Sequence, residues 1–132
     1  MDKRSAIIVW LTLFLFLIAV PAYSGMLDGK TFVGKNGEIG KKKSEDDEIQ
    51  FANGRFLSTG CAKWGFGDAE YTTRVDGDMI FFTADIYSEK YGRITYSGAV
   101  KGNRLDATFL WFEKNKYGKP EQVKWWKGKM KV

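Results

Sequence analysis

Residues 93–112 read RITYSGAVKGNRLDATFLWF, and this stretch decides the fold class. On each side of Gly102-Asn103 the side chains alternate in character, which is the period of a strand with one buried face. Glycine and asparagine reach positive φ at low cost, so a tight turn between two antiparallel strands is expected here. One face of the hairpin then carries Ile94, Tyr96, Gly98 and Val100 together with Leu105, Ala107, Phe109 and Trp111.

Short runs of β-branched and aromatic residues separated by turns continue through the rest of the chain. Asn36-Gly37, Asn53-Gly54 and Asp76-Gly77 are further hairpin signals, and no segment after residue 25 has a helical period longer than a short turn. Short connections favour an antiparallel meander, and full closure removes the exposed edge strands. We therefore expect an all-β fold, an antiparallel meander closing into a small up-and-down β-barrel, with a two-sheet sandwich as the alternative. Eight strands are expected, at residues 30–35, 48–52, 55–62, 69–75, 79–87, 93–101, 104–113 and 122–132.

The polar stretch at residues 37–47 is expected to be a loop or a weak hairpin. It contains three consecutive lysines, followed almost at once by four consecutive acids at residues 45–48. Calcium loops need oxygen ligands at staggered positions, often with a turn glycine. The acidic run is therefore interpreted as a solvated loop and not as a metal site.

The first 24 residues predict a secretory signal peptide. Lys3 and Arg4 precede an apolar run at residues 6–20, and small residues stand at the −3 and −1 positions of a cut before Gly25. An uncleaved anchor is the alternative, but the apolar run is shorter than the roughly 20 residues that span a bilayer. We expect residues 25–132 to form one barrel domain without a membrane span, periplasmic or secreted.

The composition excludes several functional classes. The chain has no histidine, which removes Ser-His-Asp and Cys-His catalysis and the usual zinc sites. Cys61 is the only cysteine, so no disulfide can form within the chain, and we expect its thiol to be buried, with pairing between chains as the alternative. The net charge of +5 is a small surplus spread among acids, which argues against a nucleic-acid partner. We therefore expect no enzymatic activity, and no metal, cofactor or nucleic-acid ligand.

The order of elements resembles that of the calycin group, the lipocalin-like, fatty-acid-binding-like and avidin-like barrels. The resemblance rests on the early segment LDGKTF at residues 27–32, the chain of short hairpins and the final strand rich in tryptophan and lysine. Lipocalins begin their barrel with Gly-x-Trp, whereas this chain has Gly29-Lys30-Thr31 at that place. The chain is also similar to small secreted bacterial proteins with a Gly-Phe-Gly-Asp loop, here residues 65–68, and a Trp-Lys-Gly tail. The calycin resemblance implies small-molecule binding.

Aromatic residues make up 16% of the chain and supply the candidate binding residues. They either line a cavity or fill the core that a small domain without disulfides needs. Two of them lie near glycines in the loop that follows Cys61, where their rings would cap a cavity or fold back onto the core. The predicted ligand contacts are Trp64, Phe66, Tyr96, Phe109 and Trp111.

Two functions of different classes follow from these features. The first is a non-enzymatic binding protein of the cell envelope or exterior that holds a small apolar or amphipathic ligand at the barrel mouth. The second is a protein-interaction module, for instance an inhibitor of an exported envelope enzyme, acting through its loops. A glycan is the other partner that aromatic rings mixed with lysines would suit.

Overall fold

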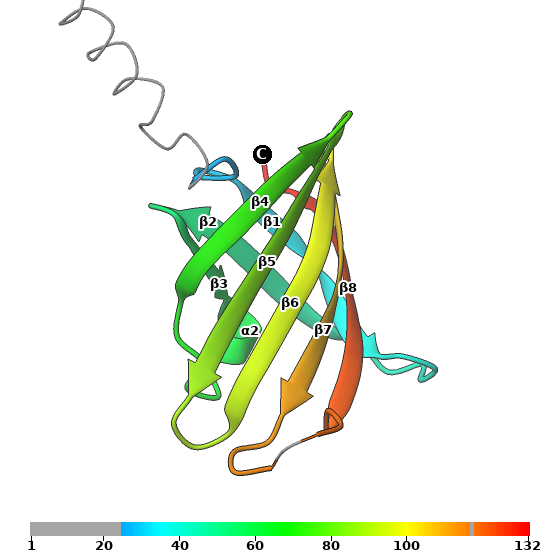
Figure 1. Ribbon diagram of the computed structural model, residues 1–132. Coiled ribbons are helices and arrows are strands. Elements are labelled where there is room, and N and C mark those ends of the chain that lie inside the picture. Colours follow the sequence, from blue (N-terminus) through cyan, green and yellow to red (C-terminus); the bar gives the residue numbers. More distant parts are fainter. Residues whose placement is uncertain (1–24, 117) are drawn as a thin grey trace, which may run out of the picture.

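The chain forms a closed eight-stranded antiparallel barrel (Figure 1). The computed structural model describes residues 25–116 and 118–132, so the predicted signal peptide lies outside the described residues. The meander and its closure confirm the expected fold class, and the sandwich alternative is wrong. The elements are β1 (Thr31–Glu38), β2 (Glu45–Ala52), β3 (Arg55–Ser58), α2 (Thr59–Ala62), β4 (Ala69–Asp76), β5 (Met79–Ser88), β6 (Gly92–Lys101), β7 (Arg104–Phe112) and β8 (Gln122–Met130).

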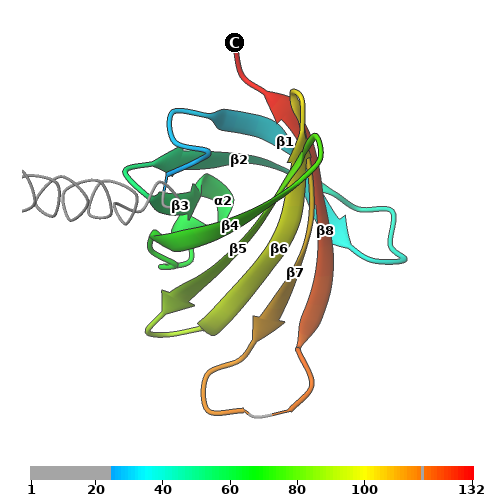
Figure 2. The same cartoon turned by 45° about the horizontal axis from the view of Figure 1, so that its top comes forward.

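The barrel closes where β1 pairs with β8, from Phe32 opposite Met130 to Glu38 opposite Lys124 (Figure 2). Gly34 faces Gly128 across this seam. A Cβ atom on Gly34 would lie 2.1 Å from the Lys127 carbonyl oxygen, so only glycine permits this approach of the two backbones. A Cβ atom on Gly128 would lie 2.7 Å from the Trp126 ring, so this glycine also makes room for the indole inside the barrel.

The inward positions of the strands carry an aromatic core. The predicted alternation is confirmed on β6 and β7, where Ile94, Tyr96, Leu105 and Phe109 are buried and the residues between them are more exposed. An eight-stranded barrel has an interior just wide enough to be filled by side chains. Here rings fill it in contact with one another, with centroid distances of 4.5–6.1 Å. The rings in this series belong to Phe32, Phe51, Phe56, Tyr71, Phe82, Tyr96 and Phe109.

Two local predictions for the first strands are wrong. Asn36-Gly37 is not a turn, because β1 continues through it to Glu38 and Asn36 is buried opposite Trp126. The acidic run is not a loop either, because β2 begins at Glu45 and pairs with β1 along its length. In both places pairing with neighbouring strands overrides the local preference of the residues.

The strand expected at residues 55–62 ends early. Only Arg55–Ser58 is a strand, and the chain then turns into the four-residue helix α2. The Ser58 hydroxyl caps this helix by accepting a hydrogen bond from the Cys61 N–H at 3.2 Å. The short helical turn that the sequence allowed is therefore placed at the end of β3.

The two ends of the barrel differ. At one end the segment before β1 packs Leu27 into the core, where its N–H donates to the Tyr71 hydroxyl at 3.0 Å. That hydroxyl in turn donates to Asp28 at 2.7 Å. The opposite end, called the loop end below, carries the four connections at residues 39–44, 63–68, 89–91 and 113–121.

Candidate functional site

Tyr96 and Phe109, two of the five predicted ligand contacts, lie inside the barrel. Their rings stack at 4.5 Å with an interplanar angle of 22°, and both residues are almost fully buried. Tyr96 also contacts Phe56 at 4.6 Å. These two rings are therefore packed as part of the core.

The other three predicted contacts lie at the loop end. Phe66 is buried, whereas Trp64 is 59% exposed and Trp111 is half-buried. Tyr91 joins the two tryptophans, because its ring packs edge-on against Trp64 at 5.6 Å and its carbonyl oxygen accepts from the Trp111 indole N–H at 2.8 Å. The structure thus brings Trp64 and Trp111 together around Tyr91, and Tyr91 and Trp111 pack against the core that contains the stacked pair.

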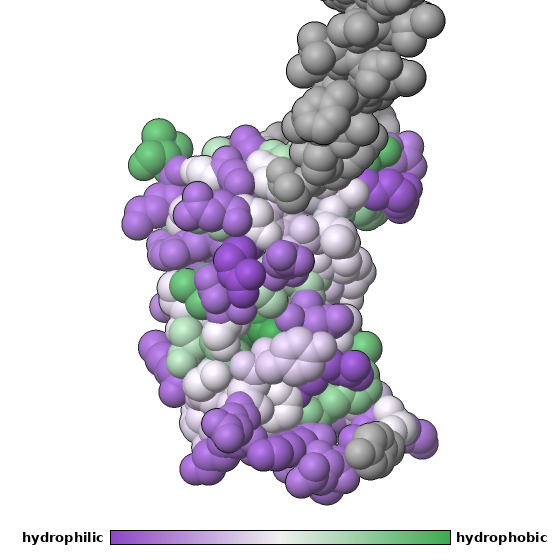
Figure 3. Space-filling view, turned by 60° about the vertical axis from the view of Figure 1, so that its left-hand side comes forward, coloured by the Kyte–Doolittle hydropathy of each residue, from purple (hydrophilic) through white to green (hydrophobic). Residues whose placement is uncertain are grey.

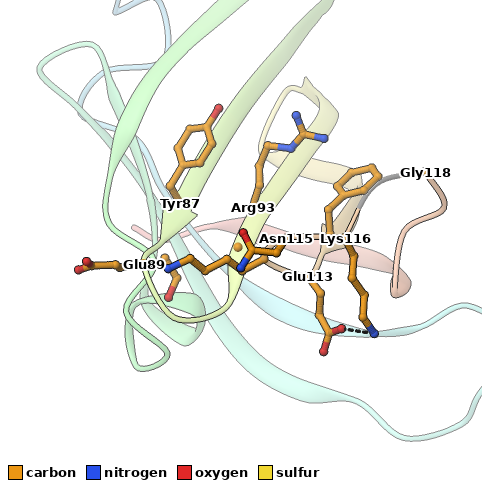
Figure 4. Close-up of a pocket in the computed structure, with 11 residues that line it drawn as sticks. Tyr87, Glu89, Arg93, Glu113, Asn115, Lys116 and Gly118 are labelled. Carbon is orange, nitrogen blue, oxygen red and sulfur yellow. Dashed lines mark ion pairs between the residues drawn. The ribbon is translucent and has the colours of Figure 1, made fainter.

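A pocket of about 500 Å³ lies on the outer surface of the barrel at the loop end (Figure 4). Its floor is a row of three outward residues on neighbouring strands, Tyr87 on β5, Arg93 on β6 and Phe112 on β7. The loop that follows β7 forms one wall, including Lys114 and Lys116, and the β5–β6 hairpin forms the other.

The lining of this pocket carries three cations, Arg93, Lys114 and Lys116, and two acids, Glu89 and Glu113. The Arg93 guanidinium lies 4.5 Å from the centre of the Phe112 ring, a cation–π contact that holds it in place. Lys116 neutralises Glu113 at 2.6 Å, and this hydrogen bond raises the pKa of the Lys116 ammonium. Arg93 and Lys114 form no ion pair among the described residues. The pocket therefore offers an exposed phenol ring, an aromatic floor and positive charge.

Sequence reasoning missed this pocket because it followed only the inward face of the hairpin. The strand register that follows from the predicted Gly102-Asn103 turn indicates which outward residues are neighbours. A two-residue turn at Gly102-Asn103 places Lys101 opposite Arg104, and counting outward along both strands places Arg93 opposite Phe112. The row could thus have been found on the outer face.

A buried carboxylate links three parts of the barrel near α2. Asp47 is 5% exposed and accepts hydrogen bonds from the Ser58 hydroxyl at 2.8 Å, the Gly60 N–H at 2.8 Å and the Trp126 indole N–H at 2.9 Å. Every donor is neutral, and the bonds join β2, α2 and β8. A carboxylate saturated by fixed protein donors serves to hold these elements together, so the interpretation of residues 45–48 as solvated is wrong for Asp47.

Cys61 lies beside this network. It is half-buried, with its Sγ atom 3.2 Å from the Tyr96 hydroxyl. Burial raises the pKa of the Cys61 thiol, and burial together with the neighbouring thiol raises the pKa of the Tyr96 phenol. The protonated thiol is a weak nucleophile, so this residue is not suited to covalent chemistry at neutral pH.

These raised pKa values predict a loss of stability in alkali. A group whose pKa is higher in the folded state contributes stability below its unfolded pKa and loses it as the pH rises through the folded value. For Cys61 and Tyr96 the unfolded values are near 9.0 and 10.0, so the urea midpoint should hold at about pH 8 and fall steadily towards about pH 11. Tyr96→Phe should reduce this fall, whereas Tyr87→Phe, which changes an exposed phenol, should not. Equal profiles for the two variants would contradict the prediction.

Neither a cluster of possible metal ligands nor a membrane-spanning helix occurs within residues 25–116 and 118–132. In that part of the chain, no three His, Cys, Asp or Glu side chains come together in a way that could hold a metal ion. Of the helices within residues 25–116 and 118–132, none is long and apolar enough to cross a membrane.

Fold and site together define a closed eight-stranded antiparallel β-barrel with an aromatic core and an outer cationic pocket. No protein-family model matches the chain, and comparisons with curated proteins and with solved structures find no match.

Proposed function

We propose that this is an exported, non-enzymatic binding protein whose ligand is a small amphipathic molecule with an acidic group, held in the outer pocket at the loop end. The observation that carries the proposal is the row of Tyr87, Arg93 and Phe112 along a pocket of about 500 Å³. Small-molecule sites typically combine apolar and aromatic surface with a few polar groups that fix orientation.

The chemistry of the row favours an acidic group joined to an apolar part. Arg93 offers a planar fork of donors that matches a carboxylate, sulfonate or phosphate, and its position over Phe112 leaves it pre-ordered. Tyr87 is 62% exposed and presents a ring face beside it. Of the two acids in the lining, Glu113 is neutralised by Lys116, and the Glu89 carboxylate points away from Arg93 (Figure 4).

Two further points support the proposal. The resemblance to lipocalin-like barrels implies small-molecule binding, and the proposed site moves that ligand from the ring-filled interior to the outer surface of the barrel mouth. The signal peptide predicted at residues 1–24 supports an exported location, in the periplasm or outside the cell.

The proposal predicts selective binding of acids over their neutral analogues. Residues 25–132 would be titrated by calorimetry with aryl and alkyl carboxylates, sulfonates and phosphates, each paired with its neutral ester or amide. The acid should bind at least roughly tenfold more tightly, because a charge-assisted hydrogen bond contributes about 1.5–3 kcal/mol. Arg93→Ala should remove this preference for the acid. Tyr87→Ala should weaken binding of the acid and binding of its neutral analogue by the same factor.

Lys101→Ala is the matched control, since it removes one exposed cation from the far end of the same strand. The affinity of the Lys101→Ala variant for the acids should equal that of the unaltered protein. Failure of every acid to bind below about 1 mM, or equal binding by Arg93→Ala, would overturn the proposal in favour of the protein-interaction alternative.

A further inference from the structure

The positive charge of the barrel is concentrated at the loop end. The four connections there contain eight lysines and four acids, and the flanking strand ends add the cations Arg93 and Lys124 and the acids Glu38 and Glu45. The three two-residue turns at the opposite end contain one charged residue, Asp78. Figure 3 shows strongly hydrophilic residues along the lower edge of the molecule, where the connections after β5 and β7 lie in Figure 1, and the connection after β1 projects from the side of the barrel. The connections of the loop end therefore carry a surplus of positive charge, whereas at the opposite end the cations Arg55, Lys101 and Arg104 stand in the strands beside the turns.

Most of these lysines face solvent without an acidic partner. Lys41 pairs with Glu38 at 2.9 Å and Lys116 with Glu113 at 2.6 Å. Lys42, Lys43 and the other loop-end lysines are exposed and form no ion pair within residues 25–116 and 118–132. Their charge is thus available to an external anion, and it is spread over separate loops instead of converging on one point.

Exposed aromatic and apolar side chains accompany this charge. Trp64 and Tyr87 are 59% and 62% exposed, and both lie at the loop end. Their backbone segments are tied together, because the Gly67 N–H donates to the Tyr87 carbonyl at 3.3 Å and the Ser88 hydroxyl donates to the Trp64 carbonyl at 3.0 Å. Ile39, 56% exposed, stands next to the lysine-rich part of its own connection.

We propose that the loop end docks onto an anionic bilayer surface, with the lysines at the lipid phosphates and Trp64 and Tyr87 at the level of the headgroups. Tryptophan and tyrosine favour the membrane–water interface because each has an apolar body and a polar tip. Lysines near an anionic surface add to the attraction one by one, without needing a shaped site. A dispersed set of lysines with aromatic side chains among them fits a planar array of headgroups better than a single compact anion.

The orientation also fits. The segments that precede β1 and follow β8 lie at the end of the barrel opposite to the loop end (Figure 1). Tyr87, Lys114 and Lys116 belong to both surfaces, but the docking proposal does not rest on the proposed ligand, because Trp64, Lys42 and Lys43 are not part of the pocket lining.

The test is vesicle binding by residues 25–132, which contain every strand of the closed barrel and its core. Flotation would compare vesicles of phosphatidylcholine alone with vesicles in which about one-third is phosphatidylglycerol. We expect at least tenfold stronger binding to the anionic vesicles at about 0.05 M salt, largely lost at about 0.5 M. Bound protein should show a blue-shifted tryptophan emission that is lost in Trp64→Phe.

Charge-reversed variants separate docking from general attraction. Lys42→Glu with Lys43→Glu should reduce vesicle binding at least tenfold. The control, Lys127→Glu with Lys129→Glu, makes the same change of charge on the outer face of β8 and should reduce it much less. Circular dichroism would show that each variant keeps the barrel. Arg93→Ala should keep most of the vesicle binding while losing the acid preference proposed for the pocket.

Three results would overturn the docking proposal. Equal binding to neutral and anionic vesicles would remove the role of charge. Equal losses in the two double variants would show that only net charge matters. Absent binding to anionic vesicles together with salt-sensitive binding to dextran sulfate would point to a soluble polyanion instead.

Discussion

Replacing Asp47 with alanine is expected to lower the free energy of unfolding by about 3–5 kcal/mol, because it leaves several buried donors without an acceptor. The Trp126 indole N–H, the Ser58 hydroxyl and the Gly60 N–H all end on this carboxylate at 2.8–2.9 Å. Domains of this size have a total free energy of unfolding of about 5–15 kcal/mol. Urea denaturation followed by tryptophan fluorescence would measure the loss.

The neighbouring residue supplies the control. Asp46 is exposed and pairs with Lys35 at 2.8 Å, so Asp46→Ala should cost at most about 1 kcal/mol. Asp47→Asn is a second test. Both carboxylate oxygens of Asp47 accept hydrogen bonds, so the amide NH2 must face a donor on one side, and a loss of about 1–3 kcal/mol is expected. If Asp47→Ala and Asp46→Ala cost the same, the carboxylate does not hold β2, α2 and β8 together.

The second large effect is expected at the centre of the aromatic core. Phe51 contacts the rings of Phe32, Phe56, Tyr71 and Phe82 at 4.8–6.1 Å and is 1% exposed. Phe51→Ala removes a ring that four others surround, and the closed barrel cannot collapse around the void. We expect a loss of about 3–5 kcal/mol, measured by the same denaturation assay.

Phe81→Ala is the matched control for the core. Phe81 lies on the outer face of β5, half-buried, with the Arg74 guanidinium 4.6 Å from its ring centre. Its loss should cost about 1 kcal/mol, mostly through one cation–π contact and partial burial. A cost for Phe51→Ala no greater than for Phe81→Ala would contradict a packed interior.

The sequence predicted the barrel well because its later strands follow the period of two closely. The strands expected at residues 79–87 and 93–101 differ from β5 and β6 by one residue at an end. In each hairpin the two sides have the same inward pattern, so local preference and tertiary pairing agree. The same agreement placed Tyr96 and Phe109 correctly on the inward face.

Predictions failed where tertiary pairing opposed local chemistry. Asn36-Gly37 favours a turn, but pairing with β8 keeps β1 extended through it. The acidic run predicts a loop position for Asp47. Ile49 and Phe51, which are buried, follow Asp47 by two and four positions. Because alternate residues of a strand share a face, this spacing indicates that the Asp47 side chain also points into the barrel.

The choice between a hollow and a filled barrel lay beyond the sequence. Both arrangements need the same inward aromatic residues, and they differ only in how side chains from opposite walls meet. The contact between Tyr96 and Phe56, for example, joins strands that are not neighbours in the sheet. The outer pocket likewise depends on the shape of the connection after β7, which its residues do not specify.

The seam between β1 and β8 also sets the order in which this molecule can fold. β1 can pair with β8 only after β8 has been synthesised. The hydrogen bond from Trp126 to Asp47 likewise spans 79 positions in the chain. A nascent chain that stops before residue 122 lacks β8, so the edges of β1 and β7 are unpaired. It also lacks the Trp126 indole, which lies over Gly128 inside the closed barrel. Contacts so distant in sequence form slowly. A polypeptide of this topology therefore cannot close into its barrel until its synthesis is nearly complete.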